Sequence, residues 1–253
     1  MRDSPEPVRS AAVGDDVAIV IPALNEAALL PLLAQKLKRL DPPASEIVLV
    51  DGGSSDGTAE WARVLGLTVV GADPPRANQI NRGVSTVTSP LVCVLHADTL
   101  LPKDAVAVIR RTLGDRRVAL ASFIPLFRGR KLRWFSTLHG WLKTWYAPLL
   151  FRPRLFLRGA RLLFGDHAMF FRRADFLSVG GCDPAAPIME DAALCIAMNR
   201  LGRVRLVHRF VVTSDRRMRE WGELRTNWIA IRIGVSWALG RRCDLDRHYP
   251  PVR

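Results

Sequence analysis

The feature that most constrains the fold is an alternation of short apolar runs with helix-like stretches across the first 115 residues. The runs are rich in β-branched residues and are bounded by turn residues, and the stretches between them have helical patterns. Pro102, after the fourth run, suits the first turn of another helix. Continuous apolar strands between helices are typical of a mostly parallel sheet covered on both faces, in the α/β class. The predicted strands span 17–21, 46–50, 67–70 and 91–95, and the predicted helices run to about residue 40, over 57–65 and over 77–84.

Three polar clusters come directly after these predicted strands. Asn25 and Glu26 follow the first, Asp51 ends the second, and His96 and Asp98 follow the fourth. In open parallel sheets, ligands bind outside the carboxyl ends of the strands. The pattern therefore predicts a ligand site that these clusters share.

The second cluster has structural as well as functional interpretations. Asp51 precedes two glycines, which allow a tight turn and the close approach of a ligand. Its carboxylate could bind a base or a ribose, or it could serve the turn alone. Asp56 stands where a helix N-cap is expected. The stretch resembles a calcium loop, but the twelfth position counted from Asp51 is Ala62 rather than the glutamate that an EF-hand requires.

Two acidic positions could carry chemistry, although a structural role explains each of them. Asp98 could hold Mg²⁺ or Mn²⁺ against a diphosphate, or it could cap a strand end. Glu190 and Asp191 stand at the start of a predicted helix, where the helix dipole favours acidic residues. They could also act as a general base toward an acceptor hydroxyl. On the residues alone, the structural role is the better explanation of this pair.

The sequence lacks the glycine-rich phosphate motifs of two large nucleotide-binding classes. No G-x-G-x-x-G follows the first strand, and no G-x-x-x-x-G-K-[ST] occurs anywhere. Phosphate charge would then be met by a metal and by basic residues. Arg76 and Arg82, which flank Asn78 and Gln79, are candidates, although ordinary helix-surface charge also explains them.

Composition narrows the partners and the compartment. The net charge of +13 suits an anionic partner such as a nucleotide or an anionic membrane surface. No helix-turn-helix, zinc or RNP signature indicates nucleic-acid binding. Four scattered cysteines fit a reducing cytoplasm. Residues 1–16 lack the apolar core of a secretory signal and are expected to form a flexible tail.

The segment 131–164 mixes tryptophan, phenylalanine and leucine with many arginines and lysines. Its charges exclude a membrane-spanning helix. One interpretation is a helix lying at a membrane interface, as an acceptor platform for a lipid or other hydrophobic acceptor. The favoured interpretation is a helix packed on the core with a basic outer face. The segment 228–240, interrupted by Arg232, is ambiguous in the same way.

Together, these segments resemble glycosyltransferase family 2, a group of inverting enzymes with the GT-A fold. The resemblance runs from Val17 to the C-terminus and is closest to the subgroup associated with arsenosugar biosynthesis. Two C-terminal segments, TSDRR at 213–217 and HYPPVR at 248–253, point to that subgroup. The motifs that carry the family resemblance are IVIPALNE (19–26), EIVLVDGGSSDGT (46–58), RANQINRG (76–83), LHADT (95–99), GDHAMFFRR (165–173) and PIMED (187–191).

The resemblance implies transfer of a sugar, with inversion, from a nucleotide-diphospho-sugar to an acceptor hydroxyl. The donor would be a UDP-sugar, and Mn²⁺ or Mg²⁺ would bind at Asp98, which matches the last residue of the D-x-D motif of the family. Asp191 would be the catalytic base, with Glu190 beside it. The residues implied at the donor site are Pro22, Asn25, Glu26, Asp51, Gly52, Arg76, Asn78, His96 and Asp98.

The sequence departs from the family pattern at His96, which replaces the first acidic residue of the D-x-D motif. An imidazole brings no negative charge, so the metal site would be weaker or completed elsewhere. His167 and His208 are candidates for that completion, although local hydrogen bonding explains each of them better. RRMREW at 216–221 does not match the Q-x-x-R-W motif, so polymer synthesis is not inferred.

We therefore expect one GT-A domain over 17–253, with a Rossmann-like sheet and a basic helical C-terminal elaboration. Its nucleotide-binding half would span 17–115 and its acceptor-side half 116–253. The expected location is the cytoplasm, with peripheral contact at the inner membrane face as a further hypothesis. A nucleotidyltransferase of related fold and a non-catalytic nucleotide-sugar or membrane-surface binding protein are the alternatives.

Overall fold

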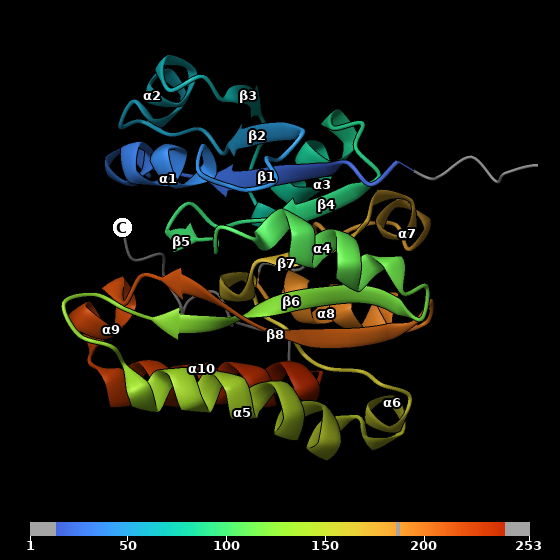
Figure 1. The fold of residues 1–253 in the computed structure, drawn as a ribbon. Helices are drawn as coiled ribbons and strands as arrows, with labels where there is room; N and C mark the ends of the chain where they lie inside the picture. The colour runs from blue at the N-terminus through green and yellow to red at the C-terminus, as the bar shows by residue number, and fades with distance from the viewer. Residues whose placement is uncertain (1–13, 186–187, 241–253) are drawn as a thin grey trace, which may run out of the picture.

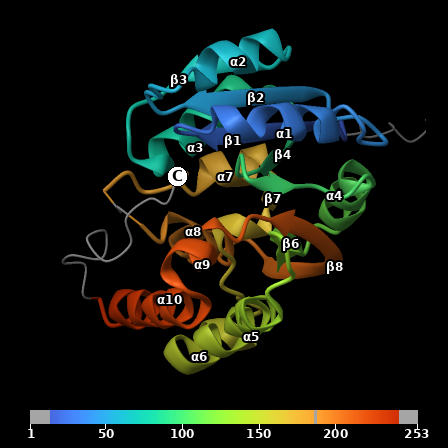
Figure 2. The same ribbon diagram turned by 90° about the vertical axis from the view of Figure 1, so that its left-hand side faces the viewer.

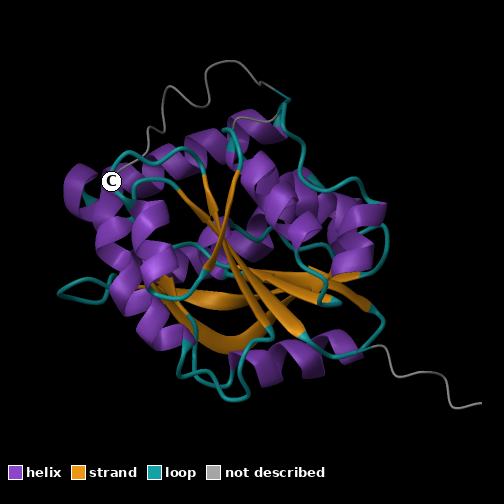
Figure 3. Ribbon diagram, turned by 90° about the horizontal axis from the view of Figure 1, so that it is seen from above, coloured by secondary structure: helices purple, strands orange, loops and turns teal. Residues whose placement is uncertain are grey.

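The computed structural model describes residues 14–185 and 188–240. Its centre is a twisted eight-stranded sheet in the order β3-β2-β1-β4-β7-β6-β8-β5. Helices cover both faces of the sheet, as Figure 1 and Figure 3 show. Cys243, most of the expected tail (1–13) and the C-terminal segment His248–Arg253 lie outside the described residues.

The first four strands of the chain form one half of the sheet, and they are all parallel to one another. They are β1 (Val17–Ala23), β2 (Glu46–Asp51), β3 (Thr68–Gly71) and β4 (Leu91–Val94), with β1 between β2 and β4. In this register Ile19 pairs with Ile47 on one side and with Cys93 on the other. The predicted parallel sheet is confirmed here, with strand limits that differ by one or two residues.

The other half of the sheet mixes directions. β7 (Met169–Arg172) is antiparallel to both β4 and β6 (Val118–Phe127), and β8 (Arg203–Thr213) is parallel to β6. The two-residue strand β5 (Thr99–Leu100) pairs with the end of β8. Because β7 links the two halves, the carboxyl ends of β1, β2, β4, β6 and β8 all lie at the same side of the molecule (Figure 1).

The helices and short helical turns connect these strands. The first predicted helix is divided into the 3-10 turn η1 and the helix α1, which ends three residues earlier than expected. The bounds are η1 (Ala27–Leu29), α1 (Leu30–Leu37), α2 (Thr58–Val64), α3 (Arg76–Thr86), α4 (Ala105–Gly114), α5 (Trp134–Phe151), α6 (Pro153–Leu157), η2 (Gly165–His167), α7 (Arg173–Ser178), α8 (Glu190–Met198), α9 (Arg216–Trp221) and α10 (Glu223–Ala238).

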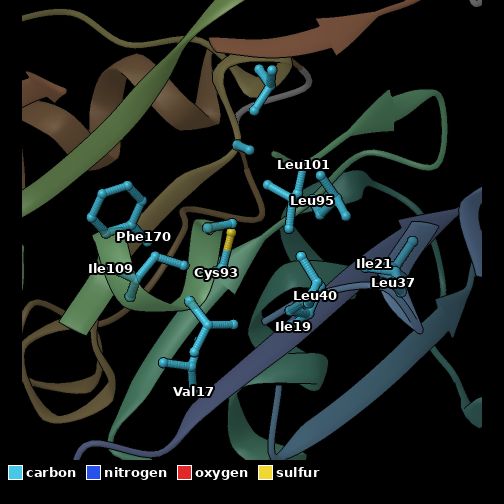
Figure 4. Packing of buried hydrophobic residues seen from close by; sticks show 14 of the residues in the cluster. Val17, Ile19, Ile21, Leu37, Leu40, Cys93, Leu95, Leu101, Ile109 and Phe170 are labelled. Carbon is cyan, nitrogen blue, oxygen red and sulfur yellow. The ribbon is translucent and has the colours of Figure 1, made fainter. Parts of the chain in front are cut away.

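Alternate side chains of each central strand enter different cores. Val17, Ile19 and Ile21 of β1 face the core that α1, α2 and α4 cover, and Figure 4 shows them beside Cys93 and the core side chains around them. The intervening residues of β1 face a second core, which α3, α7 and α8 cover. This two-sided burial explains why the central strands are apolar throughout rather than alternating.

Helix α3 approaches the sheet closely at Gly83. A Cβ atom at this position would stand 2.2 Å from Val20 Cγ1 and 2.9 Å from Val50 Cγ2. Both distances are far below van der Waals contact, so only glycine fits between the helix and strands β1 and β2. The contact holds the second half of α3 close to strands β1 and β2.

Candidate functional site

The loops after β1 and β2 are locked together by hydrogen bonds. The Asn25 side-chain oxygen accepts from the backbone N–H of Ser55 at 2.8 Å, and the backbone N–H of Asn25 donates to the Ser54 hydroxyl at 2.9 Å. Asp56 precedes Gly57, the N-cap of α2, and accepts from the N–H groups of Thr58 and Ala27. The prediction of Asp56 as the N-cap itself is therefore wrong by one residue, because the left-handed backbone at that position suits glycine.

Asp51 ends β2 at the middle of this locked pair of loops. Its Oδ2 atom accepts from the N–H groups of Gly53 and Ser54, each at 3.1 Å. Its Oδ1 atom is buried and has no hydrogen-bond partner among the described residues. Gly52 lies against the buried Gln79 of α3, whose amide nitrogen a Cβ atom would meet at 1.9 Å. One oxygen of Asp51 thus orients the side chain, while the hydrogen-bonding capacity of the other is unsatisfied.

A bridge of three side chains crosses the site from β1 to β4. Arg216, the first residue of α9, binds both carboxylate oxygens of Glu26, at 2.8 and 2.9 Å. The same guanidinium lies 3.3 Å from Asp98 Oδ2. The N–H of Ser214 also donates to the Asp98 carbonyl, at 3.2 Å. Arg216 therefore neutralises two acidic groups at the strand ends, a role that the sequence analysis did not assign to it.

His96 contacts the loop that precedes β7. Its Nδ1 atom lies 3.6 Å from Asp166 Oδ1, and its ring lies against Gly165, where an added Cβ atom would clash. Burial works to raise the pKa of Asp166, but hydrogen bonding and the charge of His96, with the charge of Arg217, hold that pKa well below its usual range. His96 and Asp166 thus form a pair beside Asp98.

The acidic pair at the start of α8 meets the same loop. Asp191 Oδ2 accepts from the Gly165 N–H at 2.5 Å, and Oδ1 accepts from the Ala192 N–H at 2.7 Å. Both acidic side chains are buried, and Glu190 lies 3.6 Å from the half-exposed Arg76. Burial first, and then the negative charge of Glu190, raise the pKa of Asp191 to about 7. A carboxylate with such a pKa can take up a proton near neutral pH.

Two further titratable groups stand behind this loop. Lys143 of α5 places its ammonium 3.6 Å from the centre of the Phe164 ring. Burial lowers the pKa of Lys143, whereas the charges of Asp166 and Asp191 raise it, and the net shift is downward. Burial also lowers the pKa of His167 to about 3, so this imidazole is neutral at physiological pH. No motif in the sequence marks Lys143 or Asp166 individually as part of the site.

The other candidate residues differ in their surroundings. Pro22 is buried within β1, opposite Val50. The Asn78 amide donates to the Pro74 carbonyl at 3.2 Å. His208 is exposed on β8. Within residues 14–185 and 188–240, no group of three or more His, Cys, Asp or Glu side chains could hold a metal ion. A metal ion at Asp98 would therefore need ligands other than further side chains of these types from this part of the chain.

Comparison with known proteins decides the family. The profile described as "Glycosyl transferase family 2" matches residues 18–180, from β1 to the end of α7. The chain belongs to this family. A curated relative, the PGL/p-HBAD biosynthesis glycosyltransferase of Mycobacterium tuberculosis (strain ATCC 25177 / H37Ra), is 32% identical over 172 residues, which are 64% of this chain and 61% of the relative. The chain thus spans about three fifths of the length of that relative.

Solved structures show the same fold at low identity. Glucosyl-3-phosphoglycerate synthase of Mycobacterium tuberculosis, in complex with phosphoglyceric acid, has a TM-score of 0.63 at 19% identity, covering 90% of this chain and 80% of that one. Mannosyl-3-phosphoglycerate synthase of Rubrobacter xylanophilus has a TM-score of 0.57 at 20% identity, covering 94% and 77%. The GT-A-like fold, with its mixed sheet between helices, is therefore confirmed.

None of the described helices is both long enough and apolar enough to cross a membrane. This includes α5 and α10, which contain the two ambiguous apolar segments.

Proposed function

We propose that this member of family 2 transfers a sugar, with inversion, from a nucleotide-diphospho-sugar to an acceptor hydroxyl. The observation that carries the proposal is the buried Asp191 beside Glu190, with its raised pKa and its hydrogen bond from Gly165, in the loop that also contacts His96. A binding protein has no need of such a proton acceptor, whereas a transferase requires one near its reacting centre.

The proposed donor is a UDP-sugar. The free Oδ1 of Asp51 can accept a hydrogen bond from the N–H of a uracil ring, and the loop hydrogen bonds hold it ready to do so. A solved structure of glucosyl-3-phosphoglycerate synthase contains Mn²⁺ and uridine diphosphate, which supports this choice at the level of the shared fold. Gly52 supports this arrangement, because the space that a side chain would need is occupied by Gln79.

Mn²⁺ or Mg²⁺ fits Asp98 as a metal that the substrate helps to hold. These ions bind through one or two carboxylates and the phosphates of a substrate, and Asp98 supplies one such carboxylate. When bound, the ion would stabilise the negative charge that develops on the leaving diphosphate. Arg216 stands within reach of the same charge and would hold Asp98 and Glu26 in place.

The proposed reaction is a single displacement. Asp191 takes the proton of the acceptor hydroxyl, whose oxygen attacks the anomeric carbon of the sugar. The bond between that carbon and the diphosphate oxygen breaks, and the nucleoside diphosphate leaves with the electron pair. Attack from the face opposite the leaving group inverts the anomeric configuration, and no covalent enzyme intermediate forms.

A decisive experiment measures nucleoside diphosphate release from UDP-, GDP- and dTDP-sugars, with Mn²⁺ or with EDTA, in the presence of a membrane lipid extract as acceptor. We expect Asp191→Asn to lose at least about a hundredfold in turnover, as is usual for loss of a general base, while its donor affinity stays unchanged. Asp41→Asn, in an exposed pair with Lys103, is the matched control. Near-normal turnover by the Asp191 variant would exclude it as the base. Donor binding without turnover by the unmodified protein would favour a binding module.

The closer resemblance to the arsenosugar-associated subgroup is also a proposal, supported by the TSDRR segment that contains Arg216. We further propose that the acceptor is lipid-like and that the protein works at the cytoplasmic face of a membrane. The exposed apolar side chains of α5 support this location.

A further inference from the structure

Helix α5 exposes its large apolar side chains and buries small or polar ones, the reverse of an ordinary surface helix. The side chains that it buries against the protein are small or polar: Ser136, Thr137, Gly140, Thr144, Ala147 and Pro148. Its exposed side chains are large and apolar: Trp134, Phe135, Leu138, Trp141, Leu142, Trp145, Leu149 and Leu150. A helix that borders water normally shows the reverse arrangement, with its apolar stripe toward the core.

The exposed residues form a continuous stripe rather than scattered positions. At 3.6 residues per turn, all of them except Leu150 fall within an arc of roughly 120°. Trp134 is 72% exposed and Leu138 56%. Single exposed apolar residues are ordinary on protein surfaces, but a contiguous patch of this kind marks an interaction site.

Helix α10 extends the patch. It runs beside α5 on the side of the molecule opposite α2 (Figure 1 and Figure 2) and exposes Leu224 and Trp228. The two helices contact each other through polar groups: Ser136 donates to Glu223 at 2.9 Å, and His139 lies 2.6 Å from Asn227 Oδ1. Because hydrogen bonds join the helices, their large apolar side chains are left for the outer face.

Positive charge surrounds this patch. Residues 128–161 contain nine arginines and lysines, and no acidic residue occurs between Asp115 and Asp166. Only Lys143 of the nine lies within α5, where it turns inward to Phe164. Four of the others precede the helix and four follow it, and one of these, Arg161, lies over the Trp145 ring. At the N-terminal end, Arg130, Lys131, Arg133 and Arg219 line a hollow of about 350 Å³ around Asp215.

We infer that the outer face of α5, α6 and α10 is a docking surface for an anionic lipid bilayer. The apolar stripe would enter the boundary between headgroups and acyl chains, and the flanking cations would contact the headgroups. A second copy of the chain fits less well, because two such faces would bring their cations together. The inference rests on the proposed function in one respect: that the acceptor reaches the enzyme from the bilayer that this surface binds.

The position of the surface agrees with that role. Six residues separate the end of β6 from the start of α5. Helix α9, which carries Arg216, lies at the same side of the molecule as this start (Figure 1). The inward-facing Lys143 contacts Phe164, next to Gly165, which donates to Asp191. The helix that carries the docking surface therefore contacts, through its inner side, the segment that leads to the proposed base.

The test is flotation with phosphatidylcholine vesicles, with and without phosphatidylglycerol. We expect the protein to float with the anionic vesicles at low salt, and its tryptophan emission to shift to shorter wavelength. Trp134→Ser/Leu138→Ser should abolish flotation, whereas Trp61→Ser/Val64→Ser on α2, which changes an equally exposed pair on the far side, should not. Arg152→Gln/Arg154→Gln/Arg158→Gln should weaken binding at least about tenfold, and Lys38→Gln/Arg39→Gln/Arg63→Gln should leave it nearly unchanged.

Two outcomes would overturn the inference. One is absence of flotation at low salt by a protein that is folded by circular dichroism. The other is a concentration-dependent dimer that Trp134→Ser/Leu138→Ser converts to a monomer, since the surface would then bind a second copy. UDP binding is measured on the same samples: UDP binding without flotation contradicts this inference alone, and flotation without UDP binding contradicts the proposed function alone.

Discussion

At the scale of single residues, the site depends on how each charge is balanced. Asp191 is ionised only at the cost of burial and of repulsion by Glu190, so its pKa is raised. Asp98 and Glu26 share one guanidinium instead. The first arrangement favours proton uptake at Asp191, and the second pairs two acidic side chains with one positive charge.

The raised pKa of Asp191 predicts the acidic limb of the activity profile. The base must be deprotonated to work, so turnover should fall as the pH drops below about 7, with an apparent pKa that belongs to the Glu190–Asp191 pair. Replacing Glu190 with Gln removes the repulsion and should move this limb to lower pH. If the acidic limb of the pH–activity profile of the Glu190 variant stays at the same pH, the negative charge of Glu190 does not raise the pKa of the base.

The same shift predicts how stability depends on pH. A carboxyl whose folded pKa lies above its unfolded value destabilises the folded state once it ionises, and this cost grows as the pH rises from about 4 to about 7. We expect Asp191→Asn to raise the free energy of unfolding by roughly 1–3 kcal/mol at pH 8. The gain should disappear near pH 4, which urea unfolding at the two pH values can check.

Arg216 predicts the order in which a metal and a nucleotide bind. The guanidinium occupies one side of the Asp98 carboxylate, so Mn²⁺ alone should bind weakly and UDP should strengthen its binding. Arg216→Gln should tighten binding of free Mn²⁺ and weaken binding of UDP. Calorimetric titrations of the unmodified protein and of the Arg216 variant, each with Mn²⁺ and with UDP, would measure these changes in affinity. Tight Mn²⁺ binding by the unmodified protein without UDP would contradict the prediction.

At the scale of elements, the packing of α3 on the sheet predicts a large effect of a small change. Gly83→Ala forces a methyl group into Val20 and Val50 and should destabilise the fold by about 1–3 kcal/mol. Gly114→Ala, at the end of α4, meets no atom within 4 Å and is the matched control. Thermal unfolding of the two variants compares them directly, and equal melting temperatures would contradict the predicted clash.

The elements also show what could be predicted from the sequence. Strands β1 to β4 follow from runs that are apolar on both faces, and the polar residues at their ends follow from the rule for parallel sheets. Strand β8 was not predicted, because exposed cations such as Arg203, Arg205 and Arg209 interrupt its apolar pattern. The expected basic outer face of the 131–164 helix was wrong: α5 is exposed on its apolar side.

The contacts between residues far apart in the chain are the part of the site that could not be predicted from the sequence. Arg216 is one of 37 lysines and arginines, and only the fold brings it to Glu26, 190 positions away. Asp166 and Lys143 gain their surroundings in the same way, from loops and helices that meet in space. Asp51, by contrast, was found because its role depends on the two glycines that follow it.

At the scale of the whole molecule, both cores include residues from either side of position 115. Strand β4 of the first half pairs directly with β7 of the second. We therefore expect one cooperative unfolding transition for residues 17–253, and no stable fold for a fragment that ends at residue 115. Calorimetry tests the first expectation and circular dichroism of the fragment the second. Two separate transitions, only one of them shifted by UDP, would instead indicate independent domains.

The exposed stripe of α5 has a kinetic consequence. In Figure 1, α5 and α10 run along strands β6 and β8, so a bilayer against them would lie parallel to these strands. The site at the strand ends would then open sideways, just above the membrane plane. Acceptor molecules would arrive by lateral diffusion in two dimensions, while the nucleotide-sugar would arrive from the water, and each substrate would have its own entrance.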